Sequence, residues 1–154
     1  MATTHRILED LLEESFSLFA IHSTLEDYAV VYALNQYLKA RFQRLRTDLD
    51  IDRGISFPIF EWRDVINDRC WTLISNYCRK AEAGKTNELF INEPSFTTYN
   101  LIPEYRDVDY FLKLEGEPEE EEDAILKSLT QIPRFITAYA VDTNKLKSKK
   151  NLIF

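Results

Sequence analysis

The spacing of apolar residues changes between about 3.6 and 2 along this chain, and that change limits the folds open to it. Residues 22–42 repeat apolar side chains at helical spacing, and Ser23 stands three residues before Glu26 as in a capping box. We expect the apolar stripe of this helix to lie across a sheet, and its residues are Leu25, Tyr28, Ala29, Val31, Tyr32, Leu34 and Leu38. From Arg44 to Asp52 apolar and charged residues alternate, which is typical of a strand with one buried face. Helices and strands are therefore mixed along one chain.

The remaining apolar segments extend this pattern. A second long helix is predicted after Pro118, over residues 118–132, and a short amphipathic helix over residues 5–15. Further strands are predicted within residues 16–23, 56–78 (a hairpin), 88–100, 109–116 and 134–144. We expect an α+β two-layer sandwich, with a mostly antiparallel sheet, two main helices on one face and a short N-terminal helix.

The length of 154 residues and a hydrophobic fraction of 45% fit a single domain spanning residues 1–154. We expect residues 1–4 to be flexible, and also residues 145–154, a basic and then apolar tail that could instead extend a sheet edge. No segment approaches the roughly 20 apolar residues of a membrane helix, and the amino terminus lacks the pattern of a signal peptide. The sequence therefore predicts a cytoplasmic protein without a membrane partner.

Cysteine usage agrees with a reducing compartment. If residues 70–78 form one strand, Cys70 and Cys78 are about 26 Å apart, which is too far for a disulfide. We expect two free thiols that serve as small packing residues.

Composition argues against several activities. The chain carries 26 acidic and 19 basic residues, a net charge of −7 that repels nucleic acid. Its three glycines cannot supply a dinucleotide-binding G-x-G-x-x-G loop. The "GKT" at residues 84–86 resembles the end of a phosphate loop, but Arg79 occupies the position where that loop needs a glycine. We predict no cofactor.

Metal ligands are also scarce. The two histidines and two cysteines lack the paired spacing of a zinc site. Asp48, Asp50 and Asp52 would project from one strand face as a seat for a divalent cation, but Arg44 and Arg46 share that face. We favour a solvated, salt-bridged surface there, and we predict no metal site.

The segment from Ile102 to Gly116 joins an irregular charged stretch to an alternating strand. Pro103 removes a hydrogen-bond donor and biases Ile102 away from helix, so an ordered turn should lead into the strand. In one interpretation the turn is a tethered corner, with Ile102 and Val108 as apolar pins and the carboxylates as caps. In the other, a ligand or partner contacts a group formed by Glu104, Arg106, Asp107, Asp109 and His22.

The same segment carries a family resemblance. Ile102-Pro103-Glu104, three residues and then Val108-Asp109-Tyr110 match every fixed position of the motif that names the IPExxxVDY family of bacterial proteins, found mainly in Bacteroidetes. The resemblance implies a cytoplasmic bacterial protein. It implies no activity, substrate or catalytic residue.

Three functions remain open from the sequence. We favour a non-catalytic protein-binding or adaptor domain, self-associating or bound to another protein through an aromatic surface or a sheet edge. The alternative is a small-ligand-binding protein or small enzyme with a carboxylate pocket around the motif, so an enzyme stays open, although no catalytic residue is assigned. RNA contact through the lysines of the tail is the weakest interpretation, because the net charge opposes it.

Overall fold

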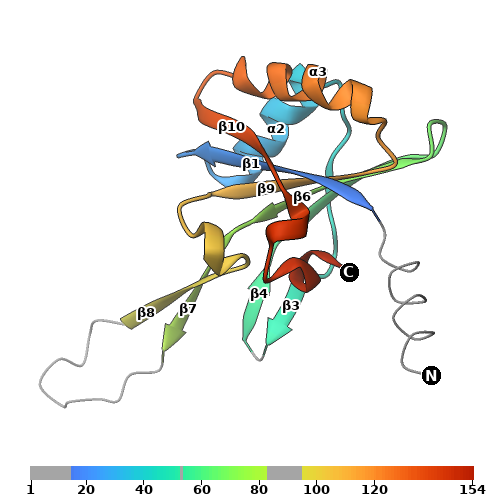
Figure 1. The fold of residues 1–154 in the computed structure, drawn as a ribbon. Coiled ribbons are helices and arrows are strands. Elements are labelled where there is room, and N and C mark those ends of the chain that lie inside the picture. Colours follow the sequence, from blue (N-terminus) through green and yellow to red (C-terminus); the bar gives the residue numbers. More distant parts are fainter. Residues whose placement is uncertain (1–14, 53, 83–94) are drawn as a thin grey trace, which may run out of the picture.

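The computed structural model describes residues 15–52, 54–82 and 95–154, and its centre is a six-stranded antiparallel sheet (Figure 1). The strand order is β10-β1-β9-β6-β5-β2. These strands are β1 (Phe16–Ser23), β2 (Gln43–Arg44), β5 (Ile59–Asp64), β6 (Arg69–Ser75), β9 (Tyr110–Glu115) and β10 (Phe135–Val141). Two hairpins extend from the sheet: β3 (Leu49–Asp52) with β4 (Ile55–Phe57), and β7 (Tyr77–Glu82) with β8 (Ser95–Asn100).

Two α-helices, α2 (Asp27–Tyr37) and α3 (Glu119–Thr130), accompany the sheet. Both contribute to one apolar cluster, in which Val30 and Leu34 of α2 and Leu129 of α3 meet Phe19 and Leu112 of the sheet. The predicted combination of two main helices with a mostly antiparallel sheet is confirmed. Residues 5–14 of the expected N-terminal helix and the "GKT" segment lie outside the described residues.

The start of α2 differs from the prediction. Ser23 ends β1 instead of capping the helix, and Glu26 occupies the cap position without a side-chain hydrogen bond. The buried side of α2 is formed by Val30, Val31 and Leu34, which places Tyr28 and Tyr32 on the opposite side, 69% and 70% exposed. The expected stripe that included both tyrosines is therefore wrong, because the helix presents its branched aliphatic side chains to the sheet.

A second apolar cluster covers the other face of the sheet. Leu18, Ile74 and Phe111 of the sheet pack there with side chains from the loops and hairpins. The loop and hairpin residues are Phe57, Leu101, Ile102, Val108, Leu146 and Leu152. The last two belong to the segment after β10, which forms the 3-10 helices η2 (Thr143–Lys145) and η3 (Lys149–Leu152) instead of an edge strand.

Lys113 of β9 lies between the sheet and this final segment, only 2% exposed. Its Nζ donates a hydrogen bond to the carbonyl of Leu152 (2.6 Å) and lies 2.8 Å from Glu115 Oε1. The ammonium also lies 4.7 Å and 4.6 Å from the ring centres of Phe16 and Phe154. The contacts of Lys113 with Leu152 and Phe154 thus hold the end of the chain against the middle of the sheet.

The strand expected from Arg44 to Asp52 is broken. Its first residue, Arg44, belongs to β2 at the edge of the main sheet, and its last four residues form β3 in a separate hairpin. Between them Arg44 pairs with Asp48 at 2.8 Å across a bend. The expected single strand with one buried face is therefore wrong, because residues 45–48 bend away from the main sheet and no residue from 44 to 52 is fully buried.

The hairpin at residues 56–78 is confirmed as β5 and β6, with its turn at residues 65–68. After β6 the chain does not continue straight to Cys78, since Asn76 separates β6 from β7. Cys70 and Cys78 are both free thiols, as expected.

Candidate functional site

The IPExxxVDY segment forms a corner between the β7–β8 hairpin and β9. It contains the short helix η1 (Pro103–Tyr105), with Ile102 before it and Val108 after it, both fully buried. The turn is closed by backbone hydrogen bonds from Tyr105 N to Ile102 O and from Val108 N to Tyr105 O, each 3.0 Å. This corner is the ordered turn predicted from Pro103.

Glu104 points from the corner toward the final segment of the chain. Its carboxylate accepts hydrogen bonds from the backbone amides of Lys147 and Ser148, both 3.1 Å, and from Ser148 Oγ at 2.5 Å. Burial alone would raise the pKa of Glu104, but these hydrogen bonds, led by those from Ser148, outweigh it and hold the pKa below its ordinary value. Glu104 therefore binds the segment between η2 and η3.

Asp109 performs a similar task at a different place. Its Oδ2 accepts a hydrogen bond from the backbone amide of Ser23 at 2.9 Å, which joins the start of β9 to the end of β1. Asp107 and Arg106 are exposed, and the Arg106 carbonyl accepts a hydrogen bond from the Tyr77 hydroxyl at 2.5 Å. The carboxylates of Glu104 and Asp109 thus bind backbone amides at two separate places in the fold.

His22 does not meet Asp109. Its Nε2 lies 3.0 Å from the Tyr139 hydroxyl of β10, and the two rings lie 5.5 Å apart. Among the expected site residues, the structure therefore brings no carboxylate and imidazole together as an acid–base pair.

Asn76 is the residue of this corner that sequence reasoning missed. Its side chain is fully buried, and its Nδ2 donates to the carbonyls of Tyr105 (2.9 Å) and Val108 (2.8 Å). Its Oδ1 accepts from the amide of Ile102 at 2.9 Å. One amide thus satisfies three backbone groups of the turn. The available signal was a single asparagine inside an otherwise apolar run, "TLISNYC".

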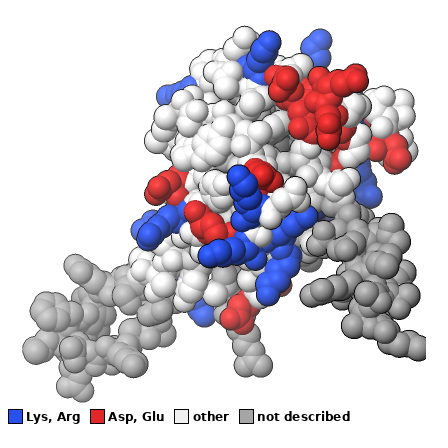
Figure 2. Space-filling view, in the orientation of Figure 1, with Lys and Arg blue, Asp and Glu red and all other residues white. Residues whose placement is uncertain are grey.

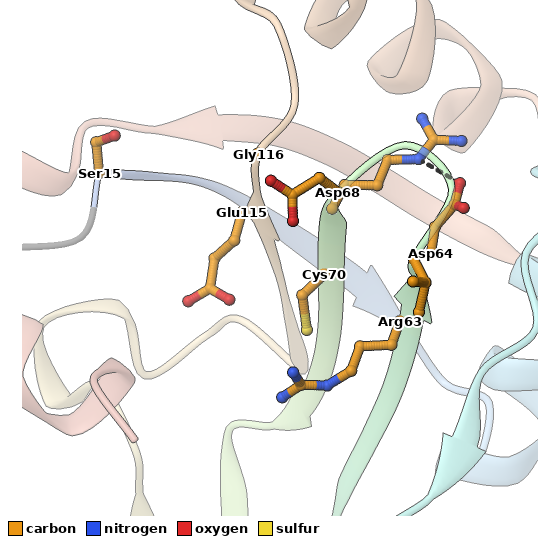
Figure 3. A pocket seen from close by; sticks show the side chains of 9 residues that line it. Ser15, Arg63, Asp64, Asp68, Cys70, Glu115 and Gly116 are labelled. Carbon is orange, nitrogen blue, oxygen red and sulfur yellow. Dashed lines mark hydrogen bonds and ion pairs between the residues drawn. The ribbon is translucent and has the colours of Figure 1, made fainter.

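Two hollows on the surface of the described residues lie at the opposite end of β6, around the β5–β6 turn. One of about 570 Å³ is lined by residues of that turn and of the end of β9 (Figure 3). Its lining includes Arg63, Asp64, Asp68, Cys70 and Glu115. Figure 3 shows Cys70 between the side chains of Arg63 and Glu115.

The chemistry of this hollow does not favour a nucleophile. Burial raises the pKa of the Cys70 thiol, and the nearby carboxylates of Glu61 and Glu115 raise it further, against a smaller opposite effect of Arg63. The thiol therefore stays protonated at neutral pH, which is the unreactive form.

A cluster of hydrogen bonds holds the two strands together where the β5–β6 turn begins and ends. Arg69 donates to Asp64 Oδ2 at 3.0 Å and to both carboxylate oxygens of Glu117, and Trp71 Nε1 donates to Glu117 Oε2 at 3.1 Å. The Arg69 guanidinium also lies 5.2 Å from the centre of the Trp62 ring. These contacts hold the position of the β5–β6 turn relative to the sheet.

The tip of this turn is apolar. Val65 and Ile66 are 85% and 94% exposed, an unusual pair of aliphatic side chains to leave in water side by side. In Figure 1 the turn extends away from the sheet at the upper right.

A second hollow, of about 640 Å³, begins at this tip and runs along the edge of the sheet. Its basic lining residues are Lys39, Arg41, Arg44 and Arg63, and its acidic ones are Glu61 and Asp64. Both carboxylates are paired within the protein, with Arg63 at 2.9 Å and Arg69 at 3.0 Å respectively. Lys39 and Arg41 have no ion-pair partner in the described part of the chain, so the hollow is locally positive.

Charge is also segregated elsewhere. The first turn of α3 carries Glu119, Glu120, Glu121 and Glu122, and Figure 2 shows acidic side chains gathered there. A group of basic side chains lies nearer the centre of that view, over the final segment of the chain. Over residues 15–52, 54–82 and 95–154, no group of three or more histidine, cysteine or acidic side chains is placed to hold a metal ion. Asp48, one of the three aspartates considered for that role, pairs with Arg44.

Comparisons with protein-family models, curated proteins and solved structures find no match to this chain. Among the described residues, no helix is long and apolar enough to cross a membrane.

Proposed function

We propose that this protein is a non-catalytic protein-binding domain, whose partner presents an acidic segment with an apolar side chain to the β5–β6 turn. The observation that carries the proposal is an exposed apolar tip, Val65 and Ile66, beside a locally basic hollow on a chain of net charge −7. Binding would bury the tip and neutralise the cations together.

The two parts of this surface play different roles in recognition. Burial of two aliphatic side chains supplies the nonspecific attraction, about 1.5–3 kcal/mol for each side chain that becomes fully buried. Lys39 and Arg41 supply selectivity for carboxylates, since neither forms an ion pair with another residue in the described part of the chain. The partly exposed Trp62 ring in the same hollow offers an aromatic wall for an apolar side chain.

The groups that first suggested an active site favour this proposal indirectly. Glu104 and Asp109 accept hydrogen bonds from backbone amides, and His22 bonds to Tyr139, so these groups serve the fold. The Cys70 thiol is held in its protonated form. A carboxylate-pocket enzyme, the alternative function, would need the same groups turned toward a common cavity.

The experiment is affinity capture from native lysate with quantitative mass spectrometry, comparing the wild type with Ile66→Ser and with Lys39→Glu/Arg41→Glu. Tyr28→Ser is the matched control for the tip, because Tyr28 is an exposed aromatic on α2. Lys127→Glu is the control for charge, because it lies in the last turn of α3.

We expect one partner to be lost in both tip and hollow variants and kept in both controls. The captured partner's acidic segment should then bind the purified protein with an affinity that falls as salt rises. Partners that are captured equally by all five proteins would overturn the proposal.

We also propose that the chain is a cytoplasmic member of the IPExxxVDY family, and that its fold is a two-layer α+β sandwich. The motif and the two free cysteines support the family and the compartment. The shared apolar cluster of α2 and α3 supports the layered arrangement.

A further inference from the structure

The β5–β6 tip, Val65 and Ile66, lies between two surfaces of opposite charge. The basic hollow of about 640 Å³ includes both tip residues in its lining. The next residue along the chain, Asn67, lines a different hollow, of about 370 Å³, which extends to Pro118 and Glu121 at the start of α3. The apolar tip therefore separates a basic surface from the acidic first turn of α3.

The start of α3 is held against the β5–β6 turn. Glu117, two residues before the helix, accepts hydrogen bonds from Arg69 Nη1 at 3.1 Å and 3.2 Å. Gly116 lies so close to the turn that a Cβ on it would be 2.5 Å from the backbone oxygen of Asp68. In Figure 1 the chain enters α3 beside the base of this turn. These contacts set the position of the acidic surface relative to the tip.

The acidic surface carries more charge than the protein itself neutralises. Glu119 and Glu120 are exposed, and neither forms an ion pair in the described part of the chain. Glu121 lies 4.0 Å from Arg69, a long and weak pairing of an exposed carboxylate. The hydrogen bond and the charge of Glu117 raise the pKa of Glu121 above its ordinary value, because like charges are crowded there. Figure 2 shows the acidic side chains gathered at this end of α3, where cations from another molecule would be attracted.

A second copy of this chain supplies such cations next to an apolar tip of its own. Lys39 and Arg41 of its basic hollow have no ion-pair partner within the described residues. A two-fold axis perpendicular to the line between the basic hollow and the start of α3 brings the tips of two copies together. The same rotation places the basic hollow of each copy opposite the acidic first turn of α3 in the other, which is an isologous interface. The surface around the tip is thus complementary to itself in charge, and each tip covers the other.

We propose that this protein forms a two-fold symmetric dimer, in which the β5–β6 tips of two copies pack together and the basic hollow of each copy binds the acidic first turn of α3 of the other. The inference rests on the proposed function, since it names a second copy of this chain as the partner that presents the acidic segment and the apolar side chains. Two aliphatic side chains from each copy make a small apolar centre, so we expect a dissociation constant on the order of 10 μM.

The first experiment is light scattering coupled to size exclusion on the full chain, over concentrations that reach on the order of 1 mM. About 0.15 M salt screens the repulsion between two copies of net charge −7 beyond roughly 8 Å and leaves contacting ion pairs in place. The mass should rise with concentration from 18.2 kDa toward twice that value. A protein that stays monomeric at the highest concentration overturns this inference. The proposed function would then stand or fall separately, on whether the lysate capture identifies a different protein that the tip and hollow variants lose.

Charge reversal tests which surfaces face each other. Lys39→Glu/Arg41→Glu places an acidic hollow opposite an acidic helix start, and Glu119→Lys/Glu120→Lys places a basic helix start opposite a basic hollow. Each double variant alone should therefore dimerise at least on the order of tenfold more weakly than the wild type. A mixture of the two double variants restores opposite charges at both contacts, so a heterodimer of near wild-type affinity should form.

Two further variants separate the tip from a general effect of charge. Ile66→Ser should also weaken the dimer, whereas Lys127→Glu, in the last turn of α3, should leave it unchanged. A thermal melt of each variant checks that it folds. A dimer that Ile66→Ser and both charge reversals leave unchanged overturns the inference, because it must use another surface. Reversals that weaken the dimer without rescue on mixing, or no more than Lys127→Glu does, also overturn it, because the basic hollow and the start of α3 then do not face each other.

Discussion

The Asp109 carboxylate accepts a hydrogen bond from the backbone amide of Ser23 at 2.9 Å, across 86 residues of sequence. The bond joins the end of β1 to the start of its neighbour β9. Five residues before Asp109, Glu104 holds the segment around Ser148 in the same way. The acids of the motif thus act as caps that fix where chain segments meet, and we regard the motif as a structural corner.

Replacement of Asn76 should be among the most destabilising single changes in the protein. Asn76→Ala leaves the amide of Ile102 and the carbonyl of Val108 without their side-chain partner in a buried place, and it removes one of the two hydrogen bonds that the Tyr105 carbonyl accepts. We expect a loss of about 3 kcal/mol or more in the free energy of unfolding. Urea denaturation measures it, with Asn144→Ala, an exposed asparagine, as the control that should change stability by less than about 0.5 kcal/mol. Equal stability of the two variants would contradict the role of Asn76.

Glu104 should make stability depend on acid pH. Its pKa is lowered in the folded protein, so the charged carboxylate stabilises the fold above its ordinary pKa of 4.5, and this contribution is lost as the pH falls through the lower folded value. Glu104→Gln should therefore melt below the wild type at pH 7, and the two melting temperatures should converge in acid below about pH 4.5. Thermal melts from pH 7 to pH 3 measure this. A constant difference across that range would show that the charge of Glu104 does not matter.

Gly54 and Gly116, the two glycines among the described residues, both have positive φ, and they should respond differently to alanine. At Gly116 (φ 80°) a Cβ would lie 2.5 Å from the backbone oxygen of Asp68, which cannot easily move. At Gly54 (φ 74°) it would meet only the flexible end of Lys80 at 2.9 Å. We expect Gly116→Ala to cost about 2–4 kcal/mol and Gly54→Ala about 1 kcal/mol, mainly from the left-handed backbone. The reverse order in chemical denaturation would contradict the close contact between Gly116 and the β5–β6 turn.

Cys70 should react slowly with thiol reagents. Its pKa is raised above the ordinary value of 9.0, chiefly by burial, so little thiolate is present at pH 8. In a Cys78→Ser variant, the alkylation rate at pH 8 should be below that of a free cysteine peptide and should increase only above about pH 9. Rapid alkylation at pH 7 would instead reopen the hollow of Figure 3 as a nucleophilic site.

Local periodicity was sufficient to predict the α+β class, the hairpin at residues 56–78, the helix after Pro118 and the final strand. These segments depend on patterns a few residues long. The turn at Ile102–Asp107 was also predictable, because a proline restricts both its own backbone and that of the residue before it.

The wrong predictions concern residues whose structure depends on contacts with distant parts of the chain. The alternation from Arg44 to Asp52 does not show whether these residues pair within one sheet or are divided between two. Lys113 stands at an ordinary position of the alternating sequence 109–116, yet it is buried because the final segment of the chain covers that face of the sheet. Asn76 has partners 26 to 32 residues away, and no local pattern encodes them.

The candidate site was the part of the structure that was hardest to predict from the sequence. The acids at 104 and 109 are typical of both caps and ligand-binding groups, and only their hydrogen-bond partners separate the two. The tip at Val65 and Ile66 looked like a plain turn between two strands, because exposure is a property of the folded surface.

Equilibrium unfolding of Glu104→Gln/Asp109→Asn, measured beside affinity capture with the same protein, tests the central claim that the motif is a structural corner. Both substitutions keep the side-chain size and remove the charge that the backbone amides bind. We expect a loss of about 1–3 kcal/mol in the free energy of unfolding, with captured partners unchanged under conditions where the variant stays folded. An unchanged free energy of unfolding together with a lost partner would contradict the claim and would make the motif a recognition site.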